Sequence, residues 1–187
     1  MIQGVRVFDT ILDGAKRKDT VSRNAADFWR PMCKSAGWAY SHERVHSLAD
    51  LKYFFSKKIE ENVIVFSGHG EVDGFHLSNG EVFTPDALAD FPDKNAGKIV
   101  IFSSCFIGKN AELTLAFKQY FDAFRLFAYT ELMYDRFCFL NESILLTLME
   151  KAGNNFTDSQ FADFQSKTDF LKNLNKKHVK NHPMVMF

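Results

Sequence analysis

VIVFSGHG, from Val63 to Gly70, and KIVIFSSC, from Lys98 to Cys105, are two short apolar runs, each ending close to a reactive side chain. Apolar runs of this length are typical of buried strands in a parallel sheet. Because neighbouring parallel strands point the same way, their carboxyl ends meet at one edge of the sheet. We therefore expect His69 and Cys105 to lie side by side there, in the arrangement that a cysteine-histidine dyad needs.

Apolar runs of strand length alternate with helix-spaced patterns along most of the chain. That alternation predicts an α/β fold, a three-layer sandwich in which helices flank a mostly parallel central sheet. Asn79 and Gly80 give a strong turn signal, so we expect a small β-hairpin after the histidine strand. The expected strands are Gly4–Leu12, Trp38–Val45, Val63–Ser67, Lys98–Ser104 and Phe124–Thr130, and the expected helices are Ser22–Ser35, Ser47–Glu61, Thr84–Phe91, Asn110–Tyr120 and Leu140–Ala152.

Length and charge restrict the function classes. The chain has 187 residues, 46% of them apolar, and we expect a core domain over residues 1–153 with a helix-prone C-terminal extension over 154–187 that packs on it or regulates it. The 23 basic and 23 acidic residues balance, and no basic block indicates binding to nucleic acid or to a membrane. Without a signal-like or membrane-spanning run, a cytoplasmic protein is expected.

The number and placement of the cysteines and phenylalanines argue against a metal site and against a cofactor site. Three cysteines without Cys-x-x-Cys spacing indicate neither a disulfide framework nor a zinc site, and Cys33 and Cys138 lie in apolar patterns typical of core residues. The 21 phenylalanines are spread over strand and helix patterns, which predicts an aromatic core and not a cofactor site. We expect no metal and no organic cofactor.

The expected chemistry follows from the properties of a thiol. A thiol with a pKa near 8.5 is mostly protonated at neutral pH, so a nucleophilic cysteine needs a neighbouring base, a cation or a helix N-terminus. A helix expected to begin near Asn110 follows Cys105 closely. His69 is predicted to accept the thiol proton, or to act mainly as the acid that protonates a leaving amine.

These motifs resemble those of the caspase-like cysteine peptidases, the group of caspases, metacaspases and CHAT-type bacterial proteins. The resemblance covers roughly Val5 to Gly153 and is carried by FSGHG after a strand, by Asp73-Gly74, by the hairpin and by a strand ending in SSC, with a weaker similarity over Asp19–Trp29. Two features depart from caspases. Phe-Ile-Gly-Lys follows the cysteine, and the histidine precedes it by 36 residues (105 minus 69) where caspases have about 50.

The resemblance implies further site residues. In these relatives the N–H groups of the glycine after the histidine and of the cysteine hold the oxyanion, here Gly70 and Cys105. The pocket for the side chain before the cut lies at the ends of the first strand and of the strand after the cysteine, where this chain has Asp9, Glu131 and Asp135. Carboxylates there favour cleavage after a basic residue. Lys16, Arg17 and Lys18 oppose this, because caspases carry an arginine of their aspartate pocket in that loop.

The leading hypothesis is thus a cysteine endopeptidase acting on a peptide or protein substrate, a regulated protease of a bacterial signalling or defence pathway. Regulation would come from a protein partner, a homodimer or self-cleavage. One alternative is a catalytically inert caspase-fold module that only binds a partner. The other is a nucleotide-binding α/β domain, although the glycines from Gly68 to Gly74 lack G-x-G-x-x-G spacing.

Overall fold

The computed structural model describes residues 1–11, 25–88, 94–175 and 179–187. Its centre is a six-stranded sheet in the order β2-β1-β3-β7-β8-β9. Neighbouring strands are parallel except for the last pair, in which β9 runs antiparallel to β8. The strands are β1 (Gly4–Asp9), β2 (Ala39–Arg44), β3 (Val63–Ser67), β7 (Ile99–Ser103), β8 (Arg125–Tyr129) and β9 (Met184–Met186). The predicted α/β class with a mostly parallel sheet is confirmed.

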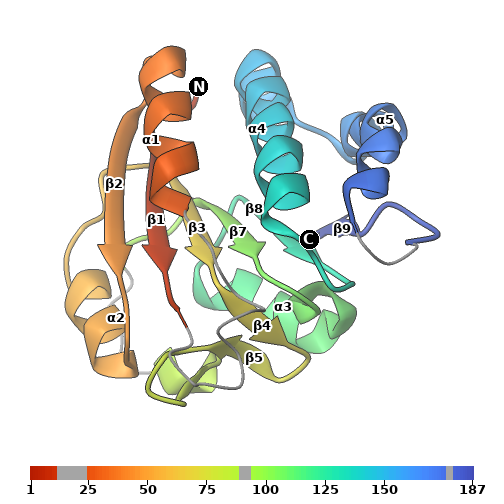
Figure 1. The fold of residues 1–187 in the computed structure, drawn as a ribbon. Coiled ribbons are helices and arrows are strands. Elements are labelled where there is room, and N and C mark those ends of the chain that lie inside the picture. The colour runs from red at the N-terminus through yellow and green to blue at the C-terminus, as the bar shows by residue number, and fades with distance from the viewer. Residues whose placement is uncertain (12–24, 89–93, 176–178) are drawn as a thin grey trace.

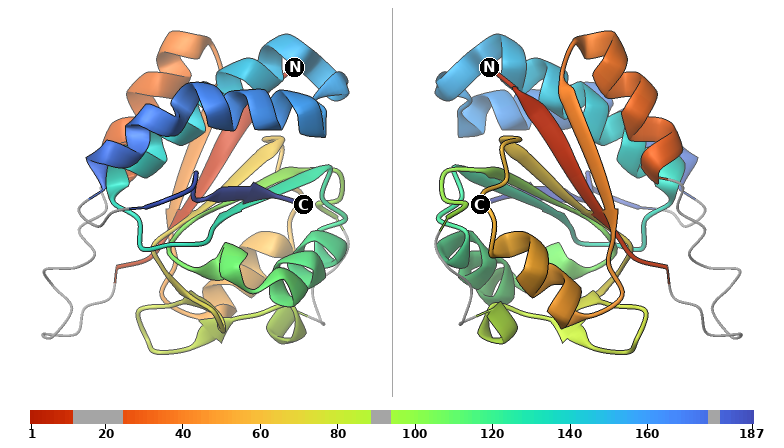
Figure 2. Two further views of the ribbon diagram at one scale, coloured as in Figure 1. Left: turned by 90° about the vertical axis from the view of Figure 1, so that its right-hand side faces the viewer. Right: turned by 90° about the vertical axis from the view of Figure 1, so that its left-hand side faces the viewer.

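Helices cover both faces of this sheet (Figures 1 and 2). On one face lie α1 (Ala25–Ala36), α4 (Asp135–Ala152) and α5 (Asp158–Thr168), and on the other α2 (Leu48–Phe55) and α3 (Ala111–Tyr120). Side chains of a strand alternate between its two faces. In β3, Val63 and Val65 therefore join the α1-α4-α5 core, whereas Ile64 and Phe66 join the α2-α3 core.

Phenylalanine rings fill the layer between the sheet and α2-α3. The ring of Phe66 stacks on that of Phe102 with centroids 5.0 Å apart, and the Phe102 and Phe117 rings are 4.6 Å apart. Phe8, Phe55 and six other phenylalanines are among the residues of this core: Phe66, Phe75, Phe83, Phe102, Phe117 and Phe121. The phenylalanines thus build a core, as the sequence predicted.

A second, smaller sheet lies beside the carboxyl ends of β3 and β7. It has the order β4-β5-β6, with β4 (His69–Glu71), β5 (Gly74–His76) and β6 (Val82–Phe83) all antiparallel. The hairpin predicted around Asn79 and Gly80 is β5-β6, and β4 is an addition that the sequence did not predict. In a nucleotide-binding fold a phosphate-binding helix would begin directly after β3, but here β4 follows instead. The strand β4 therefore argues against the alternative of a nucleotide-binding α/β domain.

Several element boundaries differ from the prediction. Ser47 caps α2 through a capping box with Asp50, but α2 ends at Phe55 and not at Glu61 as predicted. α4 begins at Asp135, five residues (140 minus 135) before the predicted start at Leu140. After α5 the extension continues as 3-10 turns over Asp169–Leu174 and ends in β9, a strand that was not predicted. Residues 16–18, the predicted helix start at residues 22–24 and the predicted helix end at residues 89–91 lie outside the described residues.

Candidate active site

The two chemistry-bearing strands are adjacent and in register. β3 pairs with β7 so that Ser67 lies opposite Ser103. His69 follows Ser67 by two residues, and Cys105 follows Ser103 by two residues. The strand ends therefore carry both residues to the same edge of the sheet.

Two glycines hold the backbone around His69 close to its neighbours. A Cβ atom on Gly70 would lie 2.6 Å from the carbonyl oxygen of Cys105 and 2.7 Å from Ser104 Oγ. One on Gly68 would lie 2.5 Å from Thr10 Cγ2. Because such distances are far below van der Waals contact, only glycine allows this approach. The backbone next to His69 thus packs directly on the backbone of Cys105.

A hydrogen bond further joins the two segments. Asn110 Nδ2 donates to the carbonyl oxygen of Val72, 2.9 Å away, in the turn between β4 and β5. Asn110 also caps α3, because its side chain accepts from the N–H of Leu113. The hairpin that carries His69 is therefore tied to the helix that follows Cys105.

Acidic groups and a second imidazole surround His69. His69 Nε2 lies 3.0 Å from Glu71 Oε1, an ion pair when the imidazole is protonated. The ring of His76, directly opposite on β5, stands edge-on to it with centroids 5.4 Å apart. The hydrogen bond between His76 and Asp73 holds the pKa of Asp73 below its ordinary value. A carboxylate beside a histidine favours the imidazolium form and fixes the ring.

Cys105 is largely buried, and its sulfur faces the backbone of the β8-α4 connection. The residue is 8% exposed. The N–H of Met133 donates to Sγ at 3.3 Å, and Sγ lies 3.9 Å from the carbonyl oxygen of Met133. A donor at this distance stabilises a thiolate more than a thiol. The helix after the cysteine begins where the sequence predicted it, with Asn110 as the N-cap of α3, but the donor directed at the sulfur is the N–H of Met133 from a distant loop.

The backbone turns sharply directly after the cysteine. Phe106 has φ 58°, in the left-handed region that residues other than glycine rarely adopt. A 3-10 turn over Ile107–Lys109 follows and leads into α3. Strained backbone of this kind is concentrated at functional sites. Here the strained residue, Phe106, directly follows Cys105 and directly precedes the 3-10 turn.

No family model matches this chain, and no curated protein matches it. Of the predicted residues, the sheet brings His69, Gly70 and Cys105 together. Sequence reasoning missed Glu71 and Met133. Glu71 could have been found, because alternate residues of a strand share a face, but nothing in the sequence indicates that the N–H of Met133 meets Cys105.

The predicted pocket residues occupy different environments. Asp9 is 1% exposed, and its carboxylate accepts from Arg44 at 2.9 and 3.1 Å and lies 2.9 Å from His42 Nε2. Burial alone would raise the pKa of Asp9, but these two partners outweigh it and hold that pKa below its ordinary value. The negative charge is thus already compensated. By contrast, Glu131 is exposed and Asp135 is half-buried.

The sheet order separates these carboxylates. β1, which carries Asp9, is three strand intervals from β8, after which Glu131 follows. At about 4.8 Å per interval this is roughly 14 Å. The three acids therefore flank the dyad strands and do not converge on one point.

The other two cysteines are core residues. Cys33 and Cys138 are fully buried, in α1 and α4, and none of the three cysteines forms a disulfide. Burial raises the pKa of the Cys33 thiol to about 11, so this thiol is protonated at neutral pH. Among the described residues, no group of three histidine, cysteine or acidic side chains could hold a metal ion. No described helix is long and apolar enough to cross a membrane.

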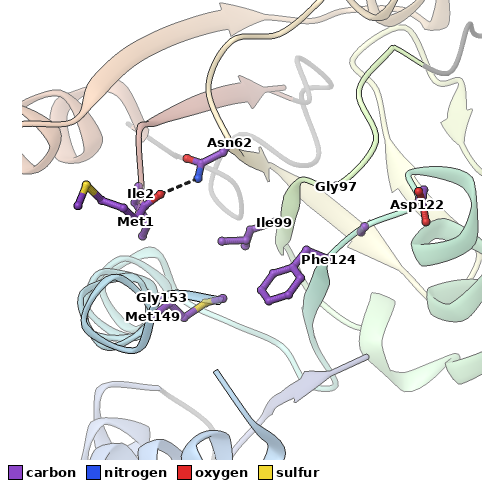
Figure 3. A pocket seen from close by; sticks show the side chains of 10 residues that line it. Met1, Ile2, Asn62, Gly97, Ile99, Asp122, Phe124, Met149 and Gly153 are labelled. Atoms are coloured by element: carbon purple, nitrogen blue, oxygen red, sulfur yellow. Dashed lines mark hydrogen bonds between the residues drawn. The ribbon is translucent and has the colours of Figure 1, made fainter. Parts of the chain in front are cut away.

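A cavity of about 450 Å³ opens at the opposite edge of the sheet, where the strands begin (Figure 3). Ile2, Ile99, Phe124 and Met149 form apolar parts of its lining. The Asn62 amide in its wall is engaged with the backbone, donating to the carbonyl of Met1 and accepting from the N–H of Gln3. This cavity is remote from Cys105 and takes no part in the dyad.

Proposed function

We propose that this chain is a cysteine endopeptidase of the caspase-like group, with Cys105 as the nucleophile and His69 as general acid and base. The main support is the close packing of Gly70 on Ser104 and Cys105, which sets the histidine hairpin against the cysteine turn. The strained backbone at Phe106 and the N–H of Met133 directed at Sγ add to it. Ser104 Oγ, buried beside Gly70, has no hydrogen-bond partner among the described residues, which is a further feature of functional sites.

The reaction would run through an acyl-enzyme. The Cys105 thiolate attacks the carbonyl carbon of the peptide bond, and the N–H groups of Gly70 and Cys105 hold the resulting oxyanion. As the C–N bond breaks, the His69 imidazolium gives its proton to the leaving amine. Water, deprotonated by the neutral imidazole, then hydrolyses the thioester and regenerates the thiol. Glu71 would stabilise the imidazolium form in the first half of this cycle.

Labelling with an electrophilic peptide probe tests the dyad. We expect the probe to form one covalent adduct with the wild type, none with Cys105→Ala, and to react about 100-fold more slowly with His69→Ala, the usual size of a general acid-base contribution. Intact-protein mass measures the adduct. Cys33→Ala, which removes a buried thiol from α1, is the matched control and should label like the wild type. Equal labelling of Cys105→Ala would exclude it as the nucleophile.

We also propose that the enzyme cuts after a basic residue. Glu131 and Asp135 are the main support for this preference, because the negative charge of Asp9 is already compensated by its own partners. A panel of fluorogenic peptides that differ only in the residue before the cut should give values of kcat/KM at least about 10-fold higher for Arg or Lys than for Leu, the size expected of one charge-assisted contact. Faster cleavage after Asp would reverse the assignment.

A second candidate function, an inert interaction module with a caspase-like fold, is favoured by one observation: the Cys105 thiol is only 8% exposed. An extended peptide cannot reach the sulfur while the backbone of Met133 covers it. Absence of any adduct with the probe, in the wild type and in variants that expose Cys105, would favour this candidate.

A further inference from the structure

The sulfur of Cys105 is covered by a short connection between β8 and α4, residues 130–134, which we call the cover. Met133 of the cover is 6% exposed, and its N–H and carbonyl both face Sγ. Phe106 N–H, in the strained turn after the cysteine, donates to the carbonyl of Glu131 at 3.4 Å. The cover therefore contacts both the thiol and the backbone beside it.

The C-terminal part of the chain holds the cover near both of its ends. We call its described residues, 169–175 and 179–187, the brace. At one end, the N–H and hydroxyl of Thr130 both donate to the carbonyl oxygen of Pro183, at 2.8 and 3.1 Å. At the other, the N–H of Tyr134 donates to Asn175 Oδ1 at 3.2 Å, and Asn175 Nδ2 lies 3.7 Å from Met133 Sδ. Asn175 is 8% exposed, so these bonds are shielded from water.

The brace is itself anchored in the fold. His182 Nδ1 accepts from the N–H of Met184, so Nε2 carries the proton and lies 3.1 Å from both Thr168 Oγ1 and Asn141 Oδ1. Burial lowers the pKa of His182 to about 4, which keeps the ring neutral in this role. Val185 of β9 packs against Gly108, where a Cβ atom would lie 2.7 Å from Val185 Cγ2, in the turn after Cys105.

We propose that the brace autoinhibits the enzyme by holding the cover over Cys105, so that a peptide reaches the sulfur only after the contacts at Asn175 and Pro183 are released. This inference rests on the proposed function, because it assigns a regulation to the same thiol. The extension that follows α4 is then a regulatory element and not only a structural one. The site in its braced form is latent, with His69 and Cys105 carried to the same edge of the sheet and the sulfur covered.

Alkylation by iodoacetamide, followed by peptide mass analysis, measures how often the cover opens, without requiring protease activity. Asn175→Ala removes the acceptor for Tyr134 N–H and the contact with Met133. We expect the alkylation rate of Cys105 to rise at least about 10-fold, because a covered thiol reacts in proportion to its open population. Thr130→Val, a smaller change that removes only the hydroxyl bond to Pro183, should raise the rate less and serves if Asn175→Ala does not fold.

Asn95→Ala is the matched control. Asn95 is 5% exposed and, like Asn175, bonds to loop backbone, accepting from Ile59 N–H and donating to the carbonyl of Lys57, but it does not contact the cover or the brace. This variant should leave the Cys105 rate within about 2-fold of the wild type. Cys33 and Cys138 report global unfolding within the same molecules. Equal Cys105 rates in wild type and Asn175→Ala, or a parallel rise at all three cysteines, would overturn the proposal.

The peptide probe separates this proposal from the proposed function. One outcome is that Asn175→Ala accelerates alkylation by iodoacetamide but neither protein reacts with the probe or cleaves a peptide. The brace then does hold the cover over Cys105, and the protease assignment is wrong. If the wild type already reacts with the probe as fast as Asn175→Ala, the protease assignment is kept and autoinhibition by the brace is excluded.

Discussion

Gly70→Ala is expected to lower the rate at which the peptide probe labels Cys105 by at least about 100-fold, because a displacement of about 1 Å at a reacting centre has that effect. The added methyl group would lie 2.6 Å from the carbonyl oxygen of Cys105, and its closest contact is thus backbone and not the end of a flexible side chain. The hairpin must therefore move away from the cysteine turn. Time courses of adduct formation measured by mass give the rate.

Gly4→Ala provides the control for crowding alone. Its Cβ would lie 2.8 Å from that of Ala39, and Gly4 begins β1 at the opposite edge of the sheet. This variant should lose stability while the folded protein keeps the wild-type labelling rate. A Gly70→Ala protein that is folded by circular dichroism and labels at the wild-type rate would show that the approach of the two segments is irrelevant to the chemistry.

Asp9→Asn is expected to lower the free energy of unfolding by about 3 kcal/mol, because a buried carboxylate would lose its charge-assisted bonds while the guanidinium of Arg44 remains. Asp9 is 1% exposed, and both of its oxygens have partners among Arg44 and His42. Urea denaturation at neutral pH, at unchanged m-value, measures the loss.

Glu60→Gln is the surface counterpart. Glu60 pairs with Lys58 at 3.0 Å, but both side chains are more than two-thirds exposed, and its loss should cost less than about 0.5 kcal/mol. Asp9→Asn could instead lower the free energy of unfolding as little as Glu60→Gln does and also abolish a preference for basic residues before the cut. Asp9 would then bind the substrate and would not stabilise the fold.

The central strands were predictable because each is a short apolar run with no competing interpretation. β3 was placed without error at Val63–Ser67, and β7 within one residue at each end. Helix ends were harder to predict, since they depend on tertiary contacts: α4 extends back to Asp135, and the apolar residues of its first turn, Phe137 and Cys138, were not assigned to the helix from the sequence. β9 could not be predicted, because three residues acquire a strand conformation only by pairing with β8.

For the site, sequence reasoning could bring His69 and Cys105 to one edge, because strand ends of a parallel sheet are set by topology alone. It could not supply what surrounds the sulfur. The cover contacts Cys105 through the backbone N–H and carbonyl of Met133. Because these groups are the same in almost every residue type, the sequence does not reveal the contact. The partners of Asp9 were likewise hidden, because Arg44 and His42 are set beside it by pairing of β1 with β2.

Both tryptophans of the chain, Trp29 and Trp38, belong to the core between the sheet and α1-α4-α5, whereas the opposite layer is built of phenylalanine. Trp38 also donates to Glu150 of α4 at 2.7 Å. Indole emission consequently reports on only one side of the molecule, the side on which α4 and α5 lie. Melting of the phenylalanine layer alone would leave the tryptophan emission unchanged, and its detection by that signal needs a tryptophan introduced on α2 or α3.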